Sequence, residues 1–232
     1  MNILVTGATR GIGKAIAENL DGNIFAIGRD IELLKKYKNY CSCDLATKEG
    51  IAKACDFIKE SKIDVLINNA GEYQYTPVLK GFDTEKLEHI VKLNLEAPLY
   101  LISAAVPYMK VQGFGRIVNI GSISGVMGEA GASLYSATKA GLIGATKALA
   151  LELAENGITI NTINPGWVDT DMGESSCSDS EFTKDEIIDC IPQKRFVSPK
   201  EVADMVKYIV SKDAKGVTGQ SINLCAGLSV GF

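Results

Sequence analysis

The pair of residues with the clearest chemical potential is Tyr135 and Lys139, in the stretch Tyr-Ser-Ala-Thr-Lys. Residues four apart on a helix share one face, so the phenol and the ammonium would lie side by side. A phenol has an ordinary pKa of about 10, and a nearby positive charge lowers it by favouring the phenolate. Tyr135 would then be a usable proton donor near neutral pH. Because ordinary amphipathic helices share this spacing, catalysis is indicated only if a site surrounds the pair.

A glycine-rich turn near the N-terminus predicts a phosphate site. The stretch Thr-Gly-Ala-Thr-Arg-Gly-Ile-Gly over residues 6–13 follows an apolar run and opens a helical pattern. Glycines let the backbone approach a phosphate closely, and a helix N-terminus offers free N–H donors. A nucleotide P-loop is excluded, because Ala8 and Ala15 stand where that motif requires Gly and Ser or Thr. A purely structural glycine turn would look the same.

The end of the second predicted strand favours NADP(H) over NAD(H). Dinucleotide-binding α/β folds usually place an acidic residue at the end of this strand, where it holds the free ribose 2′-hydroxyl of NAD(H). A basic residue at that point suits the 2′-phosphate of NADP(H). Gly28 occupies the acidic position, Arg29 follows it, and Arg10 lies in the glycine turn. Guanidinium groups bind phosphate strongly. Asp30 would offset part of that charge or cap the next helix.

Further polar residues follow or interrupt apolar segments. The run Asn-Asn-Ala-Gly over residues 68–71 comes directly after an apolar run, where a parallel sheet binds ligands. Asn94 lies inside a predicted helix over 83–111, although asparagine has mediocre helix propensity. A buried asparagine bonded to a neighbouring strand would explain it equally well. His89 is interpreted as a surface or half-buried residue without a catalytic role.

Strands and helices alternate along the chain. Short apolar runs predict strands at residues 3–6, 24–28, 40–43, 63–68, 116–121, 158–164 and 220–224. Helical patterns lie near residues 12–21, 31–38, 47–60, 83–111, 133–156 and 198–211. Strands that are apolar on both faces predict an α/β fold, a three-layer Rossmann-type doubly wound sheet of about seven parallel strands with helices on both faces. We expect a single domain over 1–232, with the irregular section 169–195 as the substrate lid, since a loop this long inside a compact domain is usually functional.

Composition excludes several functional classes. The 24 basic and 28 acidic residues give a net charge of −4, so no global field favours nucleic acid or anionic membrane. Six cysteines without a Cys-x2-Cys pair, and one histidine, predict no metal site and reduced cytoplasmic thiols. We expect no signal peptide, because Met1 runs directly into the first predicted strand without a basic or long apolar segment. The longest apolar stretch, 97–109, is too short to span a bilayer, so we expect no membrane segment.

Together these motifs resemble the short-chain dehydrogenase/reductases. The resemblance rests on the glycine turn, the Asn-Asn-Ala-Gly run, Ser122 placed thirteen residues before Tyr135, and Tyr135-x3-Lys139. It covers nearly the whole chain. Within that family the likeness is strongest to bacterial 3-oxoacyl-[acyl-carrier-protein] reductases, through the blocks at 121–128, 139–144, 164–172 and 191–196.

The resemblance implies roles for four catalytic residues. Tyr135 would protonate the carbonyl oxygen as hydride arrives from the nicotinamide, and Ser122 would hydrogen-bond the same oxygen. Lys139 would lower the Tyr135 pKa and hold the nicotinamide ribose. Asn94 would support a water that passes protons toward Lys139. The hydride chemistry itself belongs to the cofactor.

The resemblance also implies a cofactor site for NADP(H). Asp44 would contact the adenine, and the segment after the sixth strand would border the nicotinamide. The residues implied to bind the cofactor are Gly7, Thr9, Arg10, Gly11, Ile12, Gly13, Arg29, Asp44, Leu45, Asn68, Ala70, Gly71, Tyr135, Lys139, Pro165, Gly166, Val168 and Thr170. Relatives are commonly tetramers, so a homotetramer is implied.

Some features depart from the carrier-protein reductases. Gly113 and Asn156 stand where those enzymes carry basic residues that dock the acidic carrier, and Cys225-Ala226-Gly227 replaces an Asp-Gly-Gly. The expected lid should repel an acidic partner. Its acids are Asp169, Asp171, Glu174, Asp179, Glu181, Asp185, Glu186 and Asp189. The substrate therefore stays open between a 3-oxoacyl thioester, carrier-bound or free, and a small ketone, sugar, steroid or secondary alcohol. A non-catalytic NADP(H)-sensing module is the remote alternative.

Overall fold

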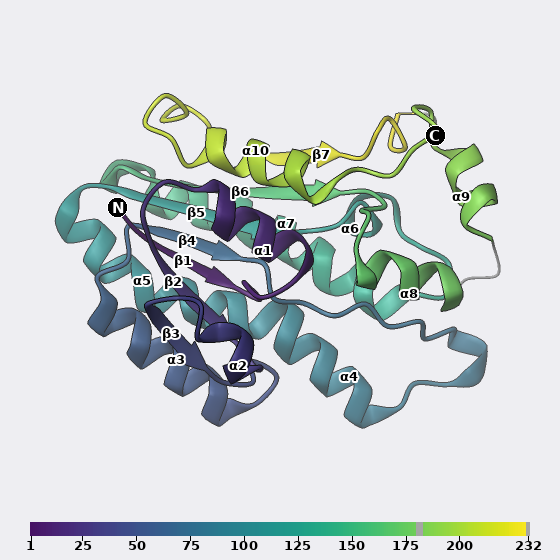
Figure 1. The fold of residues 1–232 in the computed structure, drawn as a ribbon, viewed down its shortest axis with the longest axis horizontal. Helices are drawn as coiled ribbons and strands as arrows, with labels where there is room; N and C mark the ends of the chain where they lie inside the picture. The colour runs from purple at the N-terminus through teal and green to yellow at the C-terminus, as the bar shows by residue number, and fades with distance from the viewer. Residues whose placement is uncertain (180–182, 231–232) are drawn as a thin grey trace.

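One parallel sheet organises the chain in the computed structural model, which describes residues 1–179 and 183–230 (Figure 1). The strand order is β3-β2-β1-β4-β5-β6-β7, and every neighbouring pair is parallel. The predicted fold class and all seven strands are confirmed, with ends that differ by one or two residues. The strands are β1 (Asn2–Thr6), β2 (Asn23–Gly28), β3 (Asn39–Ser42), β4 (Val65–Asn68), β5 (Gly115–Ile120), β6 (Ile158–Pro165) and β7 (Ser221–Leu224).

Helices cover both faces of the sheet because the strands are apolar on both faces. Ile3 and Val5 of β1 pack in one core with α1 (Gly11–Asn19) and α10 (Pro199–Ile209). Leu4 points the other way, into a second core with α3 (Lys48–Ser61), α5 (Ala97–Gln112) and α7 (Ser133–Leu153). Figure 1 shows α1 and α10 on the near side of the sheet. The predicted doubly wound arrangement is therefore present.

The predicted helix over 83–111 has an irregular centre. It consists of α4 (Thr84–Val91), a π-helical segment (Lys92–Glu96) and α5. Asn94 lies in the π-helical segment and is fully buried. Such segments appear frequently at functional sites, because the extra residue redirects a side chain. The low helix propensity of asparagine thus coincides with a local change of geometry.

The same run bears on the predicted absence of a membrane segment. Among the described residues, the helical run 84–112 is long and apolar enough to cross a membrane, judged by length and composition alone. This run is longer than the apolar stretch 97–109 on which the sequence-based expectation rested. Within its most apolar window, 39% is buried inside the molecule. Residues of α5 that enter the second core are Leu101, Ile102, Ala105 and Met109. Core packing therefore accounts for part of its apolar composition.

The section 169–195 is more regular than predicted. It contains α8 (Asp171–Asp179) and α9 (Lys184–Cys190), and Glu181 lies outside the described residues. A capping box between Thr183 and Glu186 begins α9. Such Thr-x-x-Glu pairs satisfy two backbone N–H groups at a helix start, so this boundary was available from sequence. In contrast, the predicted helix over 31–38 is only one turn, α2 (Ile31–Leu34).

Candidate active site

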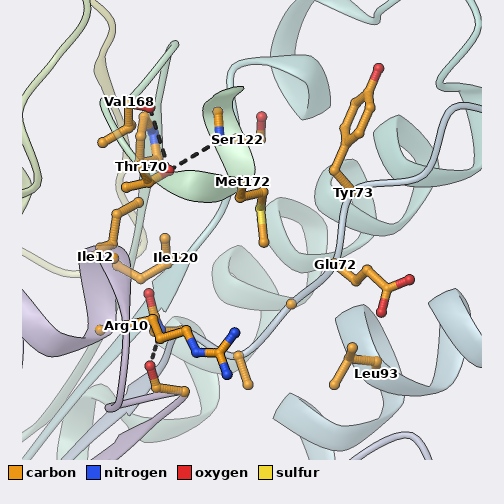
Figure 2. Close-up of a pocket in the computed structure, with 18 of the residues that line it drawn as sticks. Arg10, Ile12, Glu72, Tyr73, Leu93, Ile120, Ser122, Val168, Thr170 and Met172 are labelled. Carbon is orange, nitrogen blue, oxygen red and sulfur yellow. Dashed lines mark hydrogen bonds between the residues drawn. The ribbon is translucent and has the colours of Figure 1, made fainter. Parts of the chain in front are cut away.

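A cavity of about 480 Å³ opens at the carboxyl ends of the strands, where the strand order changes direction between β1 and β4. Ligands bind at this position in open α/β sheets. Every predicted site residue lines the cavity except Asn68 and Asn94. Figure 2 shows Arg10 at one end, and Ser122, Met172 and Tyr73 toward the other.

The glycine turn forms a tight cradle. A Cβ on Gly13 would lie 2.2 Å from the carbonyl oxygen of Gly7, and Gly7 itself has a φ of +66°. The turn is anchored to β4 by Thr6, whose hydroxyl accepts hydrogen bonds from the backbone N–H groups of Asn69 and Ala70 at 2.9 Å. The glycine spacing is therefore required by packing, whether or not a phosphate binds.

The start of α1 supports the phosphate interpretation. Arg10 is the N-cap residue of α1, and its side chain makes no capping hydrogen bond. By comparison, Asp30, Thr47 and Ser198 cap their helices with side-chain oxygens. The first N–H groups of α1 thus face the cavity without a side-chain acceptor, which suits a phosphate.

Two guanidinium groups lie at this end of the cavity. Arg10 and Arg29 are exposed and line it, together with Asp44 and Leu45. Asp30 lies 3.8 Å from Arg10 and also caps α2 through the N–H groups of Glu32 and Leu33. Both roles considered for Asp30 are present. The donor set fits a dinucleotide with an additional ribose phosphate, such as NADP(H).

The side chain of Asn68 faces away from the cavity. Its side chain is buried and donates to Asn119 Oδ1 at 2.9 Å, between β4 and β5. The next residue, Asn69, lines the cavity instead and donates to the carbonyl oxygen of Thr6 at 2.9 Å. Successive side chains at a strand end point in opposite directions, so only one asparagine can face the cavity.

Tyr135 and Lys139 lie on one face of α7, as the spacing predicts. Both are buried, and Lys139 Nζ lies 5.6 Å from the centre of the Tyr135 ring. Lys139 Nζ donates to the carbonyl oxygen of Ile120 at 2.9 Å, which fixes it at the end of β5. Burial lowers the pKa of Lys139 to about 8, because the ammonium loses hydration.

The expected lowering of the Tyr135 pKa is wrong. Burial raises it to about 12, hydrogen bonding with Ser122 lowers it, and the negative charge of Glu129 raises it further. The ammonium of Lys139 lies beside the ring and donates to a backbone carbonyl, so loss of hydration decides the direction. Tyr135 is accordingly a protonated phenol at neutral pH, the form that donates a proton.

Ser122 begins a chain of hydrogen bonds that the sequence did not indicate. Its hydroxyl donates to Ser124 Oγ at 3.0 Å, and the Ser124 hydroxyl donates to Glu129 Oε2 at 2.6 Å. The phenol of Tyr73 donates to Glu129 Oε1 at 2.9 Å. The Tyr73 ring packs edge-on against Tyr135, with centroids 5.2 Å apart. A carboxylate therefore lies two hydrogen bonds from Ser122.

Asn94 holds backbone rather than lining the cavity. Its amide donates to the carbonyl oxygen of Glu72 at 2.9 Å, and its Oδ1 accepts from the Glu72 N–H at 3.0 Å. A Cβ on Gly71 would lie 3.2 Å from Asn94 Oδ1 and 3.3 Å from Lys139 Nζ. Asn94 and Lys139 thus both lie close to the same glycine. This placement makes Asn94 a positioning residue beside the predicted site.

The segment after β6 lines one wall of the cavity. Trp167 stacks on Phe196 with ring centres 5.8 Å apart, and Val168 bridges to Val197. The Thr170 hydroxyl accepts from the N–H of Gly173 at 3.1 Å at the start of α8. Among the described residues, no group of three His, Cys, Asp or Glu side chains could hold a metal ion.

Comparison with known proteins finds reductases similar to this chain over nearly its full length. The family model described as Enoyl-(Acyl carrier protein) reductase matches residues 7–229. The chain is 36% identical to the uncharacterized oxidoreductase YxjF of Bacillus subtilis, over 97% of this chain and 96% of that protein. It is 35% identical to the 3-oxoacyl-[acyl-carrier-protein] reductase FabG of Rickettsia felis and 36% identical to that of Haemophilus influenzae. Each match covers 97% of this chain, with 95% and 96% of the respective relative.

Two solved structures of other proteins have the same fold as this chain over nearly its full length. A proposed NAD(P)-dependent gluconate 5-dehydrogenase from Beutenbergia cavernae, with bound NADP, superposes with a TM-score of 0.91 at 30% identity. The match covers 99% of this chain and 96% of that one. An actinorhodin polyketide ketoreductase variant with NADPH gives a TM-score of 0.89 at 34% identity, over 98% and 96%.

Proposed function

This chain belongs to the short-chain dehydrogenase/reductase family, and we propose that it uses NADPH to reduce the ketone of a 3-oxoacyl thioester to a secondary alcohol. One observation carries the proposal. Ser122, Tyr135 and Lys139 line the same cavity as the uncapped start of α1 and the guanidinium groups of Arg10 and Arg29. Proton donors for a carbonyl and groups for a phosphorylated dinucleotide therefore share one site.

The chemistry of the chain's own residues follows from their protonation. When bound, the reduced nicotinamide supplies a hydride to the carbonyl carbon. Tyr135, whose pKa is raised to about 12, donates its proton to the carbonyl oxygen as negative charge develops there. Ser122 turns its hydroxyl from Ser124 to that oxygen and stabilises the charge. Reduction thus consumes one hydride and one proton.

Lys139 and Asn94 support Tyr135 and Ser122 by positioning groups and supplying protons. The Lys139 ammonium, held on the carbonyl of Ile120, orients the nicotinamide ribose and replaces the proton that Tyr135 gives up. Asn94 fixes the backbone at Glu72 beside Lys139, where a water relay to solvent would run.

We further propose one domain over 1–232, the section 169–195 as substrate lid, and a cytoplasmic homotetramer.

The preference for NADPH over NADH should depend on Arg10 and Arg29. Replacing both by alanine is expected to lower the ratio of kcat/KM for NADPH to that for NADH about a hundredfold. Each guanidinium–phosphate hydrogen bond contributes about 1.5–3 kcal/mol, and only NADPH carries the 2′-phosphate. Lys14→Ala is the control, since Lys14 is an exposed cation of α1 outside the cavity. An unchanged ratio in the double variant would place the phosphate elsewhere.

The substrate class is tested by a panel of carbonyl compounds with NADPH. Acetoacetyl-coenzyme A is expected to exceed 2-butanone at least tenfold in kcat/KM, because remote binding groups of a true substrate raise transition-state binding. Acetoacetyl carrier protein should gain little more, because Gly113 and Asn156 supply no positive charge and the lid is acidic. Faster reduction of small ketones or sugars would favour the alternative substrates. Tight NADPH binding with no reduced carbonyl would favour a sensing module.

A further inference from the structure

The cavity contains a carboxylate that the reduction itself does not require. Glu129 is half-buried and lines the cavity between α6 (Ser124–Met127) and α7. Its two oxygens are held by different segments, Oε2 by Ser124 at 2.6 Å and Oε1 by Tyr73 at 2.9 Å. Because Tyr73 and Glu129 are 56 residues apart in the chain, this contact joins two walls of the cavity. The carboxylate is thereby fixed in position.

Glu129 lies close to the place where a carbonyl would bind. The carbonyl oxygen must contact both Ser122 and Tyr135, and Ser122 is joined to Glu129 through one hydroxyl, that of Ser124. The negative charge of Glu129 contributes to the raised pKa of Tyr135, so its electrostatic potential reaches the phenol that would contact the substrate carbonyl. Substituents next to a carbonyl held by Ser122 and Tyr135 would therefore bind near a negative charge.

In the part of the chain that the structure describes, Glu129 forms no ion pair with a cation. Among the described cavity-lining residues, the cations are Arg10, Arg29 and Lys139. The two arginines belong to the glycine-turn end, and Lys139 is held on the carbonyl oxygen of Ile120. The other acid beside Tyr73, Glu72, lies 3.2 Å from His89 and accepts from Gln74 at 3.1 Å.

We propose that Glu129 selects the substrate by charge, admitting compounds that are uncharged next to the reacting carbonyl, such as 3-oxoacyl esters and thioesters, and rejecting free 3-oxo acids. This inference rests on the proposed carbonyl reduction. A carboxylate can accept hydrogen bonds but cannot donate them, so a second carboxylate at this point meets repulsion without a hydrogen bond to offset it. An esterified acyl group loses that charge and keeps its shape.

Methyl acetoacetate and acetoacetate form a matched pair of probes, because they differ by one ester methyl group and one charge. The wild-type enzyme with NADPH is expected to show at least a tenfold higher kcat/KM for the ester. In Glu129→Gln that ratio should fall at least tenfold, chiefly through faster reduction of the acid. Like charges a few ångströms apart in a partly buried site exceed a tenfold effect.

Two further variants separate charge from structure. Glu129→Asp keeps the charge and should keep the wild-type ratio, even if its overall rate falls. Glu49→Gln removes one charge from an exposed position on α3 and should also leave the ratio unchanged. A ratio within each variant is insensitive to the amount of folded enzyme. An equal ratio in wild type and Glu129→Gln would overturn the inference while carbonyl reduction stands. Failure of the wild type to reduce either probe, or any thioester of the panel, would instead count against the proposed function.

Discussion

Tyr135→Phe is expected to lower kcat for carbonyl reduction about a thousandfold, the range that a positioned proton donor contributes. The substitution removes only the hydroxyl group, so the ring should keep its contact with Tyr73 and the buried face of α7. Ser122 alone would then have to stabilise the developing oxyanion. NADPH affinity should remain within about threefold, since the glycine turn and the arginines are untouched. Stopped-flow hydride transfer and fluorescence titration of NADPH measure the two quantities separately.

Tyr100→Phe is the matched control for this variant. Tyr100 lies on α5 with 57% of its surface exposed, so losing its hydroxyl should leave turnover unchanged. Retention of more than a few per cent of wild-type kcat in Tyr135→Phe would mean that another group protonates the carbonyl. A parallel loss of NADPH binding would instead indicate a damaged cofactor site.

Lys139→Met should have the second largest effect, a loss of about a hundredfold in kcat/KM for NADPH. Methionine keeps the length of the side chain but removes the hydrogen bond to Ile120 and the charge offered to the ribose. Hydrogen bonds to charged groups contribute about 1.5–3 kcal/mol, which corresponds to roughly ten- to hundredfold in binding. Both the affinity for NADPH and the rate of hydride transfer should fall.

The pH dependence distinguishes lost charge from lost packing. Because burial lowers the pKa of Lys139 to about 8, the ammonium is present below that pH and is lost above it. Wild-type kcat/KM for NADPH should therefore decline as pH rises through about 8, since this parameter reports ionisations of the free enzyme. In Lys139→Met that alkaline decline should disappear. Tyr135, with a pKa of about 12, stays protonated throughout this window.

Lys147→Met is the control on the same helix. Lys147 lies two turns beyond Lys139 and is exposed, so its replacement should change neither kcat/KM nor the pH profile. If Lys139→Met kept the alkaline decline near pH 8, the titrating group would have to be another residue. The assignment of the ribose contact to Lys139 would then be wrong.

Local sequence signals were sufficient for most of the fold. All seven strands were predicted because strands buried on both faces are continuous apolar runs, such as that ending at Asn68. The start of helix α9 could also have been predicted, since Thr183 and Glu186 form a capping box within four residues. These features depend on contacts between residues close together in the chain.

The candidate site was predicted unevenly. Spacing placed Tyr135 and Lys139 on one face of α7, and motif order brought in Ser122 and the glycine turn. The sequence did not decide which of Asn68 and Asn69 turns its side chain toward the cavity, because this depends on which way each side chain points where β4 ends. Both residues are asparagine, so residue type could not distinguish the one that faces the cavity.

Tertiary structure alone decided the electrostatics of the site. The sequence indicated a phenol beside an ammonium and hence a lowered pKa, yet the Tyr135 pKa is raised because the folded chain removes water from the phenol. Glu129 was not distinguishable from other acids until folding joined it to Ser124 and Tyr73. Residue types and spacing along the chain determine which groups are available for chemistry. Hydration and long-range contacts determine their charge and partners, and these exist only once distant segments are packed together.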